Sequence, residues 1–215
     1  MTKYKCLIWD WNGTLLDDLQ LCVEVMSNML KERNLPLLTA ERYGEIFGFP
    51  VKGYYTKLGF NFEEEHFENI SEEFISKYQK RSLCANLNEG SILMLAYIKE
   101  KGIKQVILSA SQIKNLEQQV NHFGISQYFD KLLGLDHCHA TSKVEIGREW
   151  LSKSGYTNKE VLLVGDTAHD FETAEELGCD CVLYLGGHQS RERILKLGAP
   201  VIESLYELEG YLEKL

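Results

Sequence analysis

Residues 161–178 decide the fold, and they read Val-Leu-Leu-Val-Gly-Asp-Thr-Ala-His-Asp-Phe-Glu-Thr-Ala-Glu-Glu-Leu-Gly. The four apolar residues at the start predict a short strand that is buried on both faces. Gly165-Asp166 ends this strand, and residues 168–177 predict a helix that ends at Gly178, because glycine is favoured just after a helix C-terminus. The stretch is therefore typical of one strand–helix unit of a parallel sheet.

The same alternation of strands and helices extends over most of the chain. Apolar runs predict further strands at 4–9, 106–108, 131–135 and 181–185. Helices are predicted at 89–101, 112–123, 142–154 and near 189–197, and a last strand–helix pair follows at the C-terminus. Fully apolar strands alternating with helices indicate an α/β fold: a doubly wound, Rossmann-like and mostly parallel sheet with helices on both faces.

The segment after the first strand has a different pattern. From Gly13 to about residue 82 no convincing strand is visible, and apolar residues recur at helical spacing. One helix is predicted to start near Leu19 with Asp17 or Asp18 as N-cap, two shorter ones at 39–46 and 51–58, and a fourth along the stripe that begins at Phe67. We therefore predict a core domain of residues 1–15 and 86–215, with an all-helical domain inserted at 16–85.

Composition excludes several classes of function. The chain has 32 acidic and 23 basic residues, a net charge of −9, so it lacks the cationic surplus with which proteins hold nucleic acid or an anionic membrane surface. We find no signal peptide or membrane-spanning segment, and the six cysteines form no regular pattern. The sequence favours a cytoplasmic protein, either a monomer or a homodimer.

Polar residues cluster where the predicted strands end, which is where doubly wound sheets bind their ligands. Asp10 ends the first strand, Asp166 and Asp170 follow the strand at 161–164, Ser109 follows the strand at 106–108, and Lys143 begins a helix. Converging carboxylates repel one another unless a cation lies between them, and hard oxygen ligands suit Mg²⁺. Mg²⁺ with a lysine and a hydroxyl could hold a phosphoryl group, which an adjacent carboxylate could attack.

This order of residues resembles the haloacid dehalogenase superfamily of phosphohydrolases, in its phosphoglycolate-phosphatase-like branch. The residues that carry the resemblance are Asp10-Trp-Asn12-Gly13-Thr14-Leu, then Ser109, Lys143 and Gly165-Asp166-x-x-x-Asp170. The helical insertion matches the cap domain of that branch in position and length. The resemblance implies a Mg²⁺-dependent phosphatase that forms an aspartyl phosphate and acts on a small phosphorylated metabolite.

The resemblance also implies a role for each matching residue. Asp10 would be the nucleophile, Ser109 would hold a phosphoryl oxygen, and Lys143 would bridge the phosphoryl group and Asp10. The metal ligands would be Asp10, Asp166, Asp170 and the backbone carbonyl of Asn12. Gly13, Thr14 and Ala110, on the same loops, are further candidate substrate contacts.

The sequence departs from the family at Asn12, where the family has the aspartate that acts as general acid and base. An amide cannot take that role, and general acid–base help is worth about a hundred- to ten-thousand-fold in rate. Four alternatives stay open. The enzyme is slow or prefers good leaving groups, or another residue or a water chain supplies the proton. Otherwise it resembles phosphonoacetaldehyde hydrolases with Lys52 as Schiff base, or it is a catalytically weak binding or regulatory protein.

Substrate specificity is expected to come from the inserted helices. Residues 47–55 are rich in aromatic side chains, and Arg42 and Lys52 could meet a second anionic group of the substrate. His139 and His188 are predicted on loops at the rim of the active site, where His139 could transfer a proton and His188 could contact the substrate.

Overall fold

The computed structural model describes residues 2–135 and 142–213 and contains a parallel sheet of six strands. Its strand order is β5 (Lys131–Leu135), β4 (Lys104–Gln112), β1 (Cys6–Trp9), β6 (Val161–Gly165), β7 (Asp180–Tyr184) and β8 (Val201–Ile202). Every neighbouring pair is parallel. The predicted α/β fold class is confirmed, and β1 lies in the middle of the sheet, between β4 and β6.

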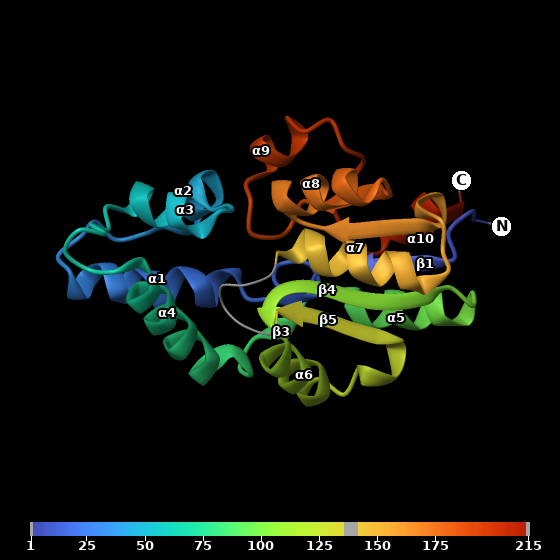
Figure 1. Cartoon of the computed structure of the whole chain (residues 1–215), viewed down its shortest axis with the longest axis horizontal. Helices are drawn as coiled ribbons and strands as arrows, with labels where there is room; N and C mark the ends of the chain where they lie inside the picture. The colour runs from blue at the N-terminus through green and yellow to red at the C-terminus, as the bar shows by residue number, and fades with distance from the viewer. Residues whose placement is uncertain (1, 136–141, 214–215) are drawn as a thin grey trace.

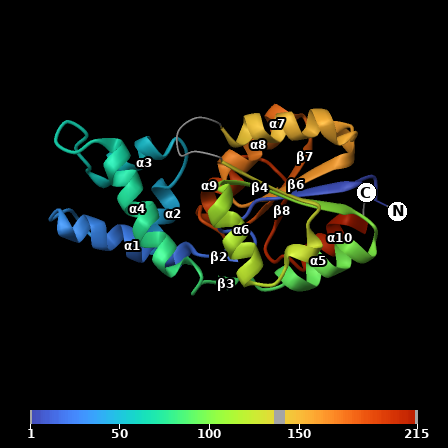
Figure 2. The same ribbon diagram turned by 60° about the horizontal axis from the view of Figure 1, so that its bottom comes forward.

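Helices cover both faces of the sheet (Figure 2), and alternate strand residues pack against each face. Leu7 and Trp9 of β1 pack on the face covered by α5 (Ser91–Glu100), α6 (Ile113–His122) and α10 (Glu207–Glu213). Cys6 and Ile8 pack on the other face, under α7 (Lys143–Ser154), α8 (Ala168–Leu177) and α9 (Arg191–Leu195). Short 3₁₀ helices at Ser126–Tyr128 and Asn158–Glu160 precede β5 and β6. Burial on both faces explains why these strands are continuously apolar.

Four helices stand beyond the end of the sheet, on the left of Figure 1. They are α1 (Leu19–Glu32), α2 (Ala40–Ile46), α3 (Val51–Leu58) and α4 (Phe67–Ser82). Their apolar side chains form a hydrophobic cluster of their own, drawn entirely from residues between Leu19 and Tyr78. We call these four helices the cap.

A small antiparallel pair of strands joins the cap to the sheet domain. β2 (Leu16–Asp17) pairs with β3 (Asn86–Leu87), so the chain enters and leaves the cap at one place. No strand was expected in this part of the chain, and that expectation was wrong, because two-residue strands are too short to show a periodic pattern.

The cap touches the sheet domain at the loop after β7, at α8 and at α9. The backbone N–H of Ser190 donates to the carbonyl oxygen of Gly44 at 3.0 Å, and the Arg193 guanidinium donates to the carbonyl oxygen of Phe47 at 2.5 Å. The ring of Phe49 stacks on His169 of α8, with centroids 4.6 Å apart. These contacts close the cap over the carboxyl ends of the strands.

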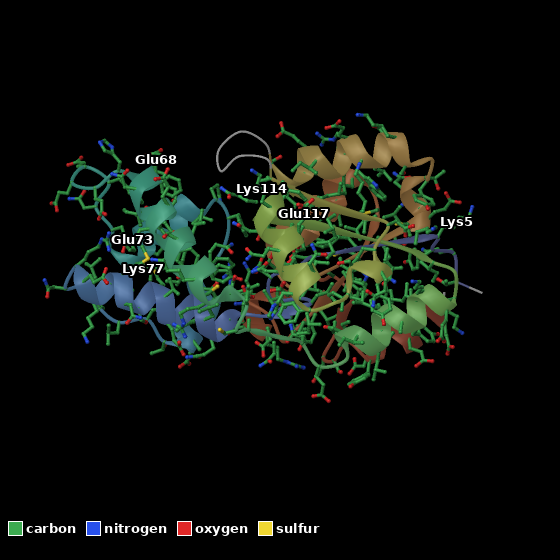
Figure 3. All side chains as sticks on the ribbon, turned by 90° about the horizontal axis from the view of Figure 1, so that it is seen from below. Lys5, Glu68, Glu73, Lys77, Lys114 and Glu117 are labelled. Carbon is green, nitrogen blue, oxygen red and sulfur yellow. The ribbon has the colours of Figure 1, made fainter. Side chains whose placement is uncertain are left out.

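Charged side chains cover the outer surface of both parts of the molecule (Figure 3). On α4, for example, Glu73 and Lys77 form an ion pair at 2.7 Å. Glu73 also pairs with Arg33, the C-cap residue of α1, at 2.6 Å. None of the described helices has the length and apolar character needed to span a membrane.

The central strands should dominate the stability of the sheet domain. Leu162 of β6 has no exposed surface, so Leu162→Ala should lower the free energy of unfolding by about 2–5 kcal/mol, because a cavity replaces its side chain. The matched control is Leu93→Ala on α5, where the leucine is 62% exposed and the change should be within about 0.5 kcal/mol of zero. Urea unfolding of the three proteins measures both effects, and equal losses would contradict the packing described above.

Candidate active site

Three buried aspartates meet at the carboxyl edge of the sheet. Asp10 follows β1 and Asp166 follows β6, and these strands are neighbours in which Trp9 pairs with Val164. Asp170 lies in the first turn of α8, which starts directly after β6. One carboxylate oxygen from each aspartate lies within 4.8 Å of one from each of the others. We call these three residues the aspartate cluster.

Lys143 reaches into this cluster from the first residue of α7. Ser142 fixes the start of the helix through a capping box with Glu145, which is a strong N-terminal signal in both sequence and structure. The Lys143 Nζ donates to Oδ1 of Asp10 and to Oδ1 of Asp170, at 2.5 Å in each case. The lysine therefore joins two of the three carboxylates, and its side chain is only 3% exposed.

Neighbouring groups hold the aspartates in place. Asp170 accepts hydrogen bonds at Oδ2 from the backbone N–H and the hydroxyl of Thr167, at 3.0 and 2.7 Å. The hydroxyl of Thr14 donates to Oδ1 of Asp166 at 2.7 Å. Thr14, which the sequence analysis considered as a substrate contact, is fully buried and supports Asp166 instead. Gly13 has a φ of +81°, and a Cβ there would lie 2.5 Å from Asp166 Oδ2, so this turn requires glycine.

The aspartate cluster holds an excess of negative charge, and this excess shows in the pKa values of its side chains. Burial, together with the Asp170 charge, raises the pKa of Asp10, and burial raises the pKa of Asp166 to about 6. Lys143 offsets the burial of Asp170 and lowers its pKa. The carboxylates in turn outweigh burial at Lys143 and raise the pKa of its ammonium group.

The donor set of this cluster fits a hard divalent cation. Three carboxylates face one ammonium group in a buried space, and carboxylate oxygens are the ligands that Mg²⁺ prefers. Asp10, Asp166 and Asp170, the three residues proposed from the sequence as side-chain ligands, are brought together by the fold.

Ser109 and Ala110 lie in β4, next to β1 in the sheet. Ile107 of β4 pairs with Trp9 of β1, so Ser109 comes level with the loop that follows Asp10. Ser109 is 1% exposed, and its Oγ accepts a hydrogen bond from the backbone N–H of Ser111 at 3.0 Å. Its hydroxyl hydrogen takes no part in that bond.

The Asn12 side chain is held on all sides by hydrogen bonds. Its Oδ1 accepts from the Ser111 hydroxyl at 2.8 Å. Its Nδ2 donates to Asp18 Oδ2 at 2.7 Å and to the Tyr78 hydroxyl at 2.9 Å. The amide therefore links the loop after β1 to β4 and to helix α4 of the cap.

Sequence reasoning missed the role of Asp18. It considered Asp17 or Asp18 as the N-cap of α1, and Asp18 does occupy that position, but its side chain makes no capping hydrogen bond. The carboxylate turns instead toward Asn12 and toward His188, whose Nε2 lies 3.1 Å from Asp18 Oδ1. A carboxylate just before a helix commonly caps that helix, so no local pattern indicates that the Asp18 side chain binds Asn12 and His188 instead.

His188 was considered a rim residue that could contact the substrate, yet it is buried. Both ring nitrogens are engaged, Nε2 with Asp18 and Nδ1 with the hydroxyl of Tyr43 at 2.9 Å. Its backbone N–H donates to Oδ2 of Asp166 at 2.7 Å. Although burial opposes it, the Asp18 charge raises the pKa of His188 to about 9. His139, the other rim candidate, lies outside the described residues.

The cationic candidates of the cap make contacts away from the aspartate cluster. Arg42 is exposed and pairs with Glu45 at 3.1 Å. Lys52 is exposed, and its Nζ lies over the rings of Phe62 and Phe67, 5.3 and 5.9 Å from their centroids. The described contacts of both side chains are within the cap.

The aromatic segment, by contrast, does turn toward the sheet domain. The ring of Phe47 lies 5.3 Å from that of His188, and Phe49 stacks on His169.

Known proteins resemble this chain over nearly its whole length. It is 25% identical to the phosphoglycolate phosphatase of Rhodobacter capsulatus over 187 residues, which cover 85% of each chain. It is 23% identical to the tyrosine-protein kinase PtkA of Mycobacterium tuberculosis, over 98% of this chain and 72% of the relative. Among solved structures, a haloacid dehalogenase-like family hydrolase from Streptococcus pneumoniae superposes with a TM-score of 0.84 at 18% identity, covering 98% of this chain and 99% of the other.

The family assignment follows from a sequence profile. The profile of the haloacid dehalogenase-like hydrolases matches residues 7–184, from β1 to the end of β7. This span includes the aspartate cluster, Lys143 and all four cap helices. The chain therefore belongs to the haloacid dehalogenase-like hydrolase family.

Proposed function

We propose that this protein is a Mg²⁺-dependent phosphatase of small phosphomonoesters, with Asp10 as the nucleophile. The observation that carries the proposal is the position of Asp10, whose carboxylate lies 2.5 Å from the Lys143 ammonium in a buried cluster with Asp166 and Asp170. A carboxylate held beside a cation, at the edge where parallel sheets bind ligands, suits attack on a phosphoryl group.

Asp10, Asp166 and Asp170 would hold the Mg²⁺ ion, together with the backbone carbonyl of Asn12. When bound, the ion would neutralise charge on the phosphoryl group. Lys143 would bind a phosphoryl oxygen while it keeps Asp10 oriented, and the Ser109 hydroxyl would donate to a second oxygen. These residues account for the binding of a phosphate group by a chain whose net charge is −9.

The reaction has two displacements at phosphorus. In the first, a carboxylate oxygen of Asp10 forms a bond to phosphorus while the bond to the ester oxygen breaks, and the alcohol leaves with that electron pair. In the second, water attacks the phosphorus of the aspartyl phosphate, the bond to Asp10 breaks, and the carboxylate is regenerated. The leaving alkoxide must gain a proton and the attacking water must lose one. The Asn12 amide can do neither.

A slow second step has a measurable consequence. With an aryl phosphate, whose leaving group needs no proton, we expect a burst of phenol equivalent to about one per active site, ahead of slow steady release. The burst occurs because phosphoryl transfer to Asp10 is faster than hydrolysis without a general base. Rapid mixing with para-nitrophenyl phosphate and Mg²⁺ measures it, and EDTA is the control that should abolish it. Linear release from the first turnover would contradict a rate-limiting hydrolysis, and absence of release would favour a phosphate-binding protein.

A second candidate function is phosphoryl transfer to a hydroxyl group other than water. The observation that favours it is Asn12, because an acceptor that ionises more readily than water needs less help from a base. A phenol has a pKa of about 10, against about 15.7 for water. The relative from Mycobacterium tuberculosis is named a tyrosine-protein kinase. A tyrosine peptide added to the burst assay should then become phosphorylated.

The phosphonatase alternative has less support, because the described contacts of Lys52 are with Phe62 and Phe67 of the cap.

A further inference from the structure

Asp18 is a buried carboxylate with an unusual number of partners. It is 1% exposed. Its Oδ1 accepts from the backbone N–H of Gly13 at 3.0 Å and lies 3.1 Å from Nε2 of His188, while its Oδ2 accepts from Asn12 Nδ2 at 2.7 Å and from the Tyr78 hydroxyl at 2.6 Å. These hydrogen bonds and the His188 charge outweigh burial and lower the pKa of Asp18. Four hydrogen-bonding groups therefore converge on the two oxygens of this carboxylate.

The position of Asp18 explains why residue 12 carries an amide and not a carboxylate. The Asn12 Nδ2 is the donor of the 2.7 Å contact with Asp18. With an aspartate at position 12, two carboxylate oxygens would meet at that distance in a partly buried place, and like charges so close cannot both stay ionised. The carboxylate of this pair is therefore the side chain of Asp18, which a single hydrogen bond joins to the Asn12 amide.

The same carboxylate lies where the cap meets the sheet domain. Tyr78 belongs to α4 and Tyr43, which holds the other side of the His188 ring, belongs to α2. His188 comes from the loop after β7 and binds Asp166 through its backbone. A single group of hydrogen bonds thus joins two cap helices, the loop after β1 and a residue of the aspartate cluster.

We propose that Asp18 is a positioning residue that carries the charge Asn12 lacks, orients the Asn12 amide, and fastens the cap over the aspartate cluster. Its effect on turnover rests on the proposed function, but its effect on folding does not. Asn12 and Asp18 form an exchangeable pair, because an aspartate at 12 and an asparagine at 18 would re-form the same hydrogen bond with donor and acceptor reversed.

The test is a double-mutant cycle with Asn12→Asp, Asp18→Asn and the double exchange, followed by urea unfolding. Each single variant removes the donor–acceptor match, so each should raise the unfolding constant about tenfold or more. The double exchange should be at least about tenfold more stable than the sum of the single effects predicts. Additivity within about twofold would overturn the pairing. Asp17→Asn, at the exposed neighbouring aspartate, is the matched control and should leave stability unchanged.

A second cycle covers the case in which a variant of position 12 does not fold. Tyr78→Phe removes only the cap hydroxyl that donates to Asp18, and it is combined with Asp18→Asn. Coupling of about threefold or more supports attachment of the cap through Asp18, and additivity overturns it. Tyr206→Phe is the control, since that tyrosine is 43% exposed.

Turnover separates a positioning role from a purely structural one. Asp18→Asn should lower turnover of para-nitrophenyl phosphate, and the double exchange should restore it and raise the ratio of alkyl to aryl phosphate turnover about tenfold or more, because position 12 then holds a carboxylate. Turnover unchanged by Asp18→Asn would overturn the positioning role. If the wild-type protein releases no phosphate, the proposed function fails, and the unfolding cycles still decide whether Asp18 fastens the cap.

Discussion

Replacing Asp10 by asparagine should abolish turnover of phosphate esters, with a loss of at least about a thousand-fold in kcat. The amide nitrogen and oxygen cannot form the acyl phosphate, while the shape of the side chain stays nearly the same. The variant should stay folded, because the change removes one negative charge from a buried cluster in which negative charges outnumber positive ones. The measurement is phosphate release from para-nitrophenyl phosphate with Mg²⁺, together with mass spectrometry of the trapped phosphoenzyme, which should be absent.

The control for this variant is Asp17→Asn, in the short strand β2 and with an exposed side chain. It makes the same chemical change and should leave kcat within about twofold of the wild-type value, as expected of a surface position. If Asp10→Asn retains turnover that EDTA also fails to remove, Asp10 is not the nucleophile and the proposed function is wrong.

Replacing Lys143 by methionine should have the second large effect, and it should act on stability as well as on turnover. The Lys143 ammonium binds both Asp10 and Asp170 at 2.5 Å. Methionine keeps most of the apolar stem but leaves buried carboxylates without their cation, which costs about 3–5 kcal/mol. Urea unfolding without metal should show this loss. Added Mg²⁺ should stabilise the variant more than the wild-type protein, because the ion compensates for the missing charge.

Lys114→Met is the matched control, because this exposed lysine also lies in the first turn of a helix, α6. It should change the free energy of unfolding by less than about 0.5 kcal/mol. Equal losses in the two variants, or a Lys143→Met protein as stable as the wild type, would contradict the ion pairs described for the aspartate cluster.

Much of the fold could be predicted from the sequence because its strands are buried on both faces. The run at 161–164 is continuously apolar, and the structure has β6 over Val161–Gly165 and α8 over Ala168–Leu177. The helices predicted at 51–58 and 168–177 have those same bounds in the structure. The predictions of strands failed where the residues show no periodic hydrophobic pattern. The β2–β3 pair has two residues in each strand, and β4 extends to Gln112 beyond an irregular register after Leu108.

The candidate site also has one part that could be predicted from the sequence and one part that could not. Asp10, Lys143, Asp166 and Asp170 stand at strand ends or helix starts, so the parallel topology alone brings them to one edge of the sheet, and the structure has the three aspartates together. Their catalytic roles stay predictions. The partners of Asn12 could not be foreseen, because Tyr78 and Ser111 are 66 and 99 positions away. The approach of Tyr78 depends on how the cap closes on the sheet domain.

The sequence by itself determined the α/β architecture, the inserted helices and the edge at which the acidic residues meet. This was possible because buried strands and helices have a characteristic spacing of apolar residues, and because particular residue types mark the ends of helices. Only the tertiary structure decided what surrounds Asn12. Asp18 has the same sequence signature whether it caps α1 or binds Asn12 and Tyr78, and packing of the cap selects the second arrangement. Side-chain contacts between distant segments have no such local pattern, so they follow from the folded chain alone.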